Sequence, residues 1–184
     1  MEVRTLMIAG LMVAAGTPLA GQEPAARRFF LEGRAGAVVP TFDIADVAKT
    51  GFALGGTVGY RFGRLILMGE FDYGMHKDKA TESVDITTLH YMAKLGYQLT
   101  PPKERGLEAS INLGVGAVTF DVDGAPESFT YPAINAGAKL AYHLSPAVAL
   151  VLSPQGDIAF TDENEVGSST AWVWPVTAGL RLRF

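Results

Sequence analysis

The three histidines are the side chains of this sequence best suited to catalysis or metal binding. His143 stands two positions before Ser145, and a histidine beside a serine could activate the hydroxyl group for acyl transfer. No acidic residue in the sequence is placed to orient His143. His76 and His90 fall in separate segments, whereas a metal site needs ligands that converge. We therefore predict no catalytic and no metal-binding residues.

Other features of the composition narrow the functional classes further. The acidic segments "TDENEVGSS" and "DVDG" could bind Ca²⁺ weakly, but solvated loops explain them better. The absence of cysteine excludes disulfides, thiolate metal sites and a lipid anchor on an N-terminal cysteine. A net charge of −4 argues against a nucleic-acid partner, which would require a basic surface. No cofactor is expected.

Most of the remaining charged residues lie in segments where polar and apolar residues alternate. The last segment, "TAGLRLRF", puts Leu180, Leu182 and Phe184 on one face of a β-strand and Arg181 and Arg183 on the other. With 21 glycines and 10 prolines the composition fits an all-β chain. The alternation predicts eight strands, at residues 29–39, 52–62, 65–75, 85–99, 107–120, 131–144, 147–160 and 171–184.

The connections between these strands fall into two classes. Short ones follow the second, fourth and sixth strands, and longer polar ones, such as "PTFDIADVAKTG" and "TDENEVGSST", follow the others. Outer-membrane barrels have short periplasmic turns and longer extracellular loops, so both termini should be periplasmic. Beyond the first twenty residues, no apolar run is long enough to cross a bilayer as a helix, although mean hydropathy is +0.20.

The charged faces of the strands could point outward, as in a soluble barrel with an apolar lumen, or inward, with lipid outside. The charged residues are Glu32, Arg34, Arg61, Glu70, Asp72, Lys94, Glu108, Lys139, Asp157, Arg181 and Arg183. Their signs nearly balance, as a buried network requires, and an arginine facing the middle of the bilayer would cost about 2–4 kcal/mol.

Aromatic residues near both ends of the apolar faces favour the inward arrangement, because lipid interfaces select aromatic girdles. The predicted girdle residues are Tyr60, Phe62, Tyr97, Tyr142, Trp172 and Trp174. We therefore predict an eight-stranded antiparallel up-and-down transmembrane β-barrel with a polar lumen filled by side chains.

The C-terminal residues carry a resemblance to a known family. Thr177, Gly179, Leu182 and the terminal Phe184 resemble the terminal recognition signal of bacterial outer-membrane β-barrels. This resemblance implies recognition by the barrel-assembly machinery, which could pair with the exposed edge of the last strand. The chain as a whole resembles the small OmpA/OmpX-type eight-stranded outer-membrane barrels in strand number, loop asymmetry and this final motif.

The first twenty residues have the order of a secretory signal peptide: Arg4 near the start, an apolar stretch, then small residues. We predict that residues 1–20 are cleaved and that residues 21–184 form the barrel domain in the bacterial outer membrane. Expected partners are outer-membrane lipids and lipopolysaccharide, the assembly machinery during insertion, and no nucleic acid.

An eight-stranded barrel leaves an interior that side chains can fill, so the inward charges should form a plug. We expect Glu32 to pair with Arg181 or Arg183, and Glu70 with Lys94. The predicted function is a closed structural or surface-interaction barrel without catalytic activity.

Two alternative functions remain open. The first is a narrow channel for small solutes. The second, a minor one, is a lipid-modifying enzyme, because His143-Leu144-Ser145 resembles the His-x-Ser of lipid A deacylases. The resemblance is weakened by Pro146, where that family has asparagine, and by the position of the motif at a periplasmic turn.

Overall fold

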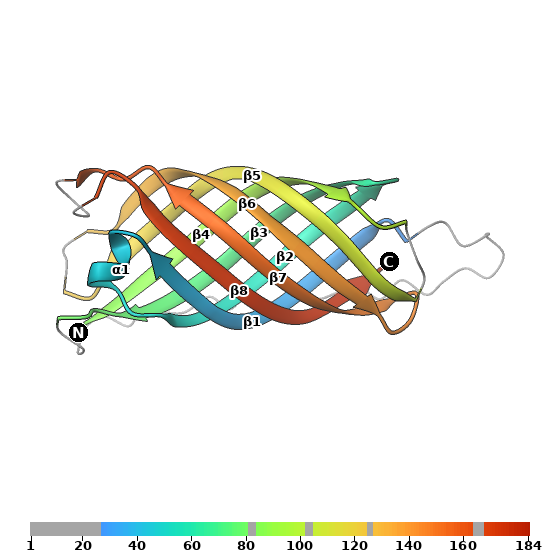
Figure 1. Ribbon diagram of the computed structural model, residues 1–184, viewed down its shortest axis with the longest axis horizontal. Helices are drawn as coiled ribbons and strands as arrows, with labels where there is room; N and C mark the ends of the chain where they lie inside the picture. The colour runs from blue at the N-terminus through green and yellow to red at the C-terminus, as the bar shows by residue number, and fades with distance from the viewer. Residues whose placement is uncertain (1–26, 81–83, 102–104, 125–126, 164–167) are drawn as a thin grey trace, which may run out of the picture.

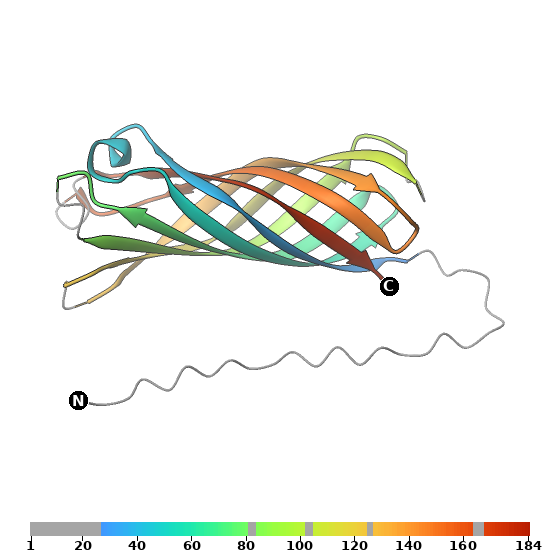
Figure 2. The same ribbon diagram turned by 90° about the horizontal axis from the view of Figure 1, so that it is seen from below.

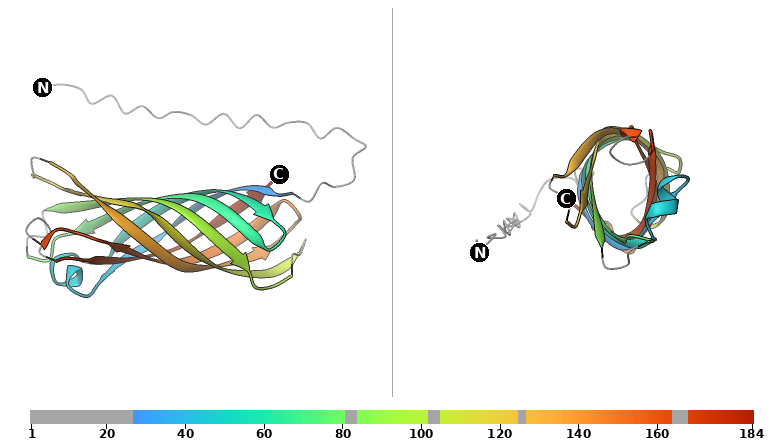
Figure 3. Two further views of the ribbon diagram at one scale, coloured as in Figure 1. Left: turned by 90° about the horizontal axis from the view of Figure 1, so that it is seen from above. Right: turned by 90° about the vertical axis from the view of Figure 1, so that its left-hand side faces the viewer.

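The chain forms a closed barrel of eight antiparallel strands in which each strand pairs with the next and β1 pairs with β8 (Figure 1; Figure 3). The computed structural model describes residues 27–80, 84–101, 105–124, 127–163 and 168–184. The strands are β1 (Phe29–Thr41), β2 (Gly51–Phe62), β3 (Leu65–Lys77), β4 (Asp85–Gln98), β5 (Gly106–Val122), β6 (Phe129–His143), β7 (Val148–Ala159) and β8 (Ala171–Arg183).

The predicted fold class is confirmed, and the strand limits agree with the predicted ones to within two residues. The first long loop differs from expectation, because it contains the short helix α1 (Ile44–Val47). A helix of four residues is too short to show a hydrophobic period in the sequence. Ile44 of this helix is buried, so α1 lies over the end of the barrel rather than apart from it.

The two ends of the barrel differ, as the lengths of the connections predict. Short connections follow β2, β4 and β6 at the end where the C-terminus lies, which we call the turn end (Figure 2). The β2–β3 turn uses Gly63, whose φ of 62° is in the left-handed region that favours glycine. Helix α1 and the longer connections lie at the opposite end, the loop end. The two terminal strands close the barrel where the Phe184 amide donates to the Phe29 carbonyl oxygen at 2.9 Å.

The barrel is apolar outside and polar inside. Outward side chains include Leu95 and Leu113, which are 57% and 69% exposed, whereas inward ones include Lys94 and Lys139, which are 2% and 1% exposed. A surface of this kind is stable only against an apolar solvent. No helix in the described residues is long and apolar enough to span a bilayer.

Apolar side chains also occupy both ends of the lumen, which the sequence did not lead us to expect. At the turn end, Phe30, Ile66 and Met68 form one cluster. At the loop end, Ile44 packs with a second cluster that includes Phe120. The loop end of the lumen is therefore mainly apolar, whereas at the turn end the apolar cluster lies beside buried polar residues such as Arg61 and Arg183.

Candidate functional site

The lumen is the candidate site, because it holds the charged residues singled out in the sequence. All of them point inward from the strands and are at least nine-tenths buried. They are Glu32, Arg34, Arg61, Glu70, Asp72, Lys94, Glu108, Lys139, Asp157, Arg181 and Arg183. Alternation along each strand puts them on the inner face, and barrel closure then brings them to a common axis.

The middle of the lumen is organised around Glu70 of β3. Its carboxylate lies 3.1 Å from a guanidinium nitrogen of Arg34 and 2.7 Å from Nζ of Lys139. It also forms an ion pair with Lys94, the partner expected from the sequence. The Thr57 hydroxyl donates a further hydrogen bond to it at 2.9 Å. One carboxylate thus compensates part of the charge of three buried cations.

Several contacts of this region cross the lumen between strands that are not neighbours. Lys139 of β6 reaches Glu32 of β1 at 2.7 Å. From the same side of β1, Arg34 donates to the Ser153 hydroxyl of β7 at 2.7 Å and pairs with Asp72 of β3 at 3.0 Å. Side chains joined in this way occupy the cross-section of the barrel instead of lining its wall.

A second group, nearer the turn end, is organised around Glu108 of β5. The Glu108 carboxylate lies 2.5 Å from Arg61, 2.7 Å from Arg183 and 3.2 Å from Arg181. Arg181 connects this group to the middle of the lumen, because it also lies 2.6 Å from Glu32. Of the two partners expected for Glu32, the structure therefore brings Arg181 to it, and Arg183 goes to Glu108 instead.

A third group, at the loop end, has the order acid, histidine and hydroxyl. Nδ1 of His90 lies 2.8 Å from Asp157, and its Nε2 lies 3.1 Å from the Thr88 hydroxyl. Thr88 and His76 border a cavity of about 20 Å³, which is room for one water molecule and not for a substrate. Sequence reasoning missed this group, because Thr88 and His90 are on β4 and Asp157 is on β7.

The His143-Ser145 pair does not form a nucleophile and its base. The Ser145 hydroxyl accepts hydrogen bonds from the amides of Ala147 and Val148, so it caps the β6–β7 turn. The expectation that no acid contacts His143 is wrong: its Nε2 lies 3.2 Å from the Glu108 carboxylate. The strand register brings the two side chains together, because Glu108 and His143 lie on the paired strands β5 and β6 near the turn end. Among the described residues no cluster of three or more possible ligands could hold a metal ion.

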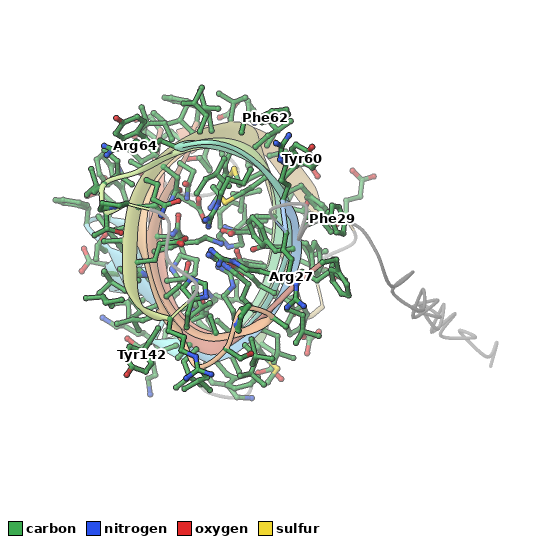
Figure 4. The ribbon with its side chains drawn as sticks, turned by 90° about the vertical axis from the view of Figure 1, so that its right-hand side faces the viewer. Arg27, Phe29, Tyr60, Phe62, Arg64 and Tyr142 are labelled. Carbon is green, nitrogen blue, oxygen red and sulfur yellow. The ribbon has the colours of Figure 1, made fainter. Side chains whose placement is uncertain are left out.

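The aromatic residues expected in girdles lie on the outer face at the two ends of the barrel. Tyr60, Phe62 and Tyr142 lie around the turn end (Figure 4). Tyr97 of β4 lies at the same end, where it pairs with Leu65 of β3. At the loop end the Trp172 ring contacts the Phe42 ring with centroids 5.1 Å apart. The Trp174 indole donates to the Thr41 hydroxyl at 3.1 Å, which anchors β8 to β1.

The four residues of the C-terminal motif are divided between the two faces of β8, two on each. Leu182 and Phe184 are exposed on the outer face, and Thr177 is buried on the inner face. Gly179 lies where β8 pairs with β1, and a Cβ atom there would come 1.9 Å from the carbonyl oxygen of Gly33. The glycine thus permits the close approach of the closing strands. Recognition by the assembly machinery stays a prediction.

A closed eight-stranded barrel that is apolar outside and ionic inside defines the class of small transmembrane β-barrels. This chain belongs to the outer membrane protein beta-barrel domain family, whose model matches residues 6–184. It is thus a bacterial outer-membrane β-barrel protein, as the resemblance predicted. No curated protein sequence matches the chain significantly.

Solved structures share the fold at low sequence identity. Neisserial surface protein A is 17% identical, with a TM-score of 0.63 over 85% of this chain and 97% of that one. A major outer membrane protein from Thermus thermophilus is 15% identical, with a TM-score of 0.60 over 85% and 98%. OprG from Pseudomonas aeruginosa is 14% identical, with a TM-score of 0.58 over 85% and 95%. At this identity the likeness concerns the fold alone.

Proposed function

We propose that the protein is a closed outer-membrane barrel that serves a structural or surface-interaction role without catalysing a reaction. The observation that supports this best is the set of ion pairs across the lumen. Lys139 joins β6 to β1 and β3, and Arg34 joins β1 to β3 and β7. A hydrated ion that entered would have to displace buried partners held in low dielectric, which is costly.

The apolar cluster at the loop end of the lumen supports the same proposal. Water and ions would have to pass Ile44 and Phe120 at that end, and at the turn end they would meet Phe30 beside the buried ion pairs of Glu108. The apolar side chains of the loop-end cluster cannot replace the hydration of an ion. If the lumen is closed, the loops and the outer wall are the surfaces through which the protein contacts other molecules.

The proposal also includes the predicted signal peptide, the assembly signal of β8 and the contact with lipopolysaccharide. Residues 1–20, the predicted signal peptide, lie outside the described residues, and we propose that they direct the chain through the inner membrane and are then removed. The barrel-assembly machinery would recognise the edge of β8 through Leu182 and Phe184, whose side chains are exposed. Lipopolysaccharide would contact the outer wall and the loops.

Conductance in planar bilayers tests the closed lumen. The purified barrel should give no steady channel, and liposomes that contain it should not swell in small sugars. A charge-balanced double variant, Glu70→Ala with Lys139→Ala, removes the centre of the plug and should increase ion leakage. Leu150→Ala on the outer face is the control and should not increase ion leakage. Steady conductance by the unmodified protein would favour the narrow-channel alternative instead.

A further inference from the structure

Four exposed arginines lie at the turn end of the barrel, on the side that extends from β1 to the start of β5. Arg27 and Arg28 precede β1, Arg64 lies in the β2–β3 turn, and Arg105 precedes β5. We call these four residues the arginine rim. Within the described residues, none of these four side chains forms a hydrogen bond or an ion pair with a protein group. As far as the described residues are concerned, their guanidinium groups are therefore available to an external anion.

The arginine rim is interleaved with the aromatic girdle. Figure 4 shows Arg64, Phe62, Tyr60, Phe29 and Arg27 following one another around the rim. The rings of Tyr60 and Phe62 lie 4.5 Å apart, and the side chain of Phe62 is 56% exposed. Aromatic girdles lie at the depth of the lipid headgroups, so the neighbouring arginines are placed at the same depth.

The backbone of the rim is anchored to the barrel. The amide of Gln98 donates to the carbonyl oxygen of Arg64 at 2.8 Å, and the amide of Arg61 donates to that of Arg28 at 2.8 Å. The arginines thus extend from fixed positions, and a planar guanidinium group can donate two parallel hydrogen bonds to a phosphate.

The exposed charges of the loop end have the opposite sign. Lys77 and Lys79 are outnumbered there by exposed carboxylates. These carboxylates are Asp43, Asp46, Asp121, Asp123, Glu127, Asp162 and Glu163. Attraction to anionic headgroups is therefore a property of the turn end and not of the barrel as a whole.

We propose that the arginine rim binds the headgroups of anionic phospholipids in the periplasmic leaflet. Barrels of this class place their short turns on the periplasmic side, so the rim faces that leaflet. The acyl chains pack below the aromatic girdle while the phosphates accept hydrogen bonds from the guanidinium groups. The inference does not depend on whether the lumen conducts.

Competition between spin-labelled lipids tests this proposal. The full-length barrel is reconstituted in phosphatidylcholine vesicles with traces of spin-labelled phosphatidylglycerol or spin-labelled phosphatidylcholine. The motionally restricted fraction in the spectrum gives the relative affinity of the protein for the two lipids. We expect about a fivefold preference for phosphatidylglycerol at low salt, and little preference at 1 M salt, where charges are screened beyond roughly 3 Å.

A matched pair of variants assigns the effect to the rim. Arg27→Gln with Arg64→Gln should reduce the preference to about twofold or less, because two cations near the surface are lost. Lys77→Gln with Lys79→Gln removes equal charge at the loop end and should leave the preference unchanged. A heat-modifiability gel verifies that both variants are folded.

Three results would overturn the proposal. The unmodified protein could show no preference between the two lipids. The rim variant could keep the full preference for phosphatidylglycerol. The loop-end control could lose as much of that preference as the rim variant does. Salt-sensitive binding to purified cell-wall sacculi in the absence of any lipid preference would assign the rim to a different partner.

Discussion

Replacing Glu70 by glutamine should weaken the barrel strongly. The Glu70 carboxylate contacts the charged groups of Arg34, Lys94 and Lys139, all of them buried. Glutamine keeps the shape and can still accept the hydrogen bond from Thr57. The charge, however, is lost, and three cations remain close together without their shared partner.

The expected loss follows from the burial of this cluster. Removing one partner of a buried ion pair costs about 3–5 kcal/mol, because the other charge is left uncompensated. We expect a loss in that range in the free energy of unfolding. Removing one of the cations as well, in Glu70→Gln with Lys94→Met, should recover about 1–3 kcal/mol, since contacting residues are not additive.

Reversible unfolding by urea in lipid vesicles measures these values, with tryptophan fluorescence and gel mobility as independent signals. Glu163→Gln, at an exposed loop position, is the control and should change stability by less than about 0.5 kcal/mol. A loss below about 1 kcal/mol for Glu70→Gln, or a double variant weaker than both single ones, would refute the idea that mutual compensation of charge stabilises the lumen.

Three further predictions concern other parts of the barrel. Gly59→Ala should destabilise the barrel by about 1–3 kcal/mol, because the new Cβ would lie 2.1 Å from the ring of Phe30. Gly69→Ala is the control: its new Cβ would enter open space, so it should be tolerated in the same unfolding assay. A nitroxide on Leu150→Cys, introduced into a chain without cysteine, should be relaxed by oxygen in the bilayer and not by a water-soluble nickel complex; the reverse would contradict the lipid-facing assignment. Phe184→Ala should lower the amount of folded barrel in cells while leaving the refolded protein stable, and an unchanged yield in fractionated membranes would argue against an assembly signal.

The strands and the facing of their residues could be read from the sequence, because both depend on local alternation. Arg181 and Arg183 must share one face of β8, since successive side chains of a strand point to opposite sides. The inner position of that face follows because charged groups cannot face hydrocarbon without a large cost. The same reasoning placed the connections, since loop length and composition are local properties.

Pairs on neighbouring strands could be anticipated in part, and pairs across the lumen could not. Glu70 and Lys94 lie on the adjacent strands β3 and β4, close in register. The contacts of Lys139 with β1 and β3 instead depend on how far each strand is staggered when the barrel closes. No local pattern in the sequence encodes that stagger.

Alternation along each strand, a local property, is what the sequence by itself determined: eight strands, an apolar exterior and an ionic interior. Only the tertiary structure decided that Arg183 meets Glu108, that Asp157 reaches His90, and that Ile44 covers the loop end. The physical reason is that each of these contacts joins segments far apart in the chain. Their distances are set by closure and stagger of the whole sheet and not by any segment alone.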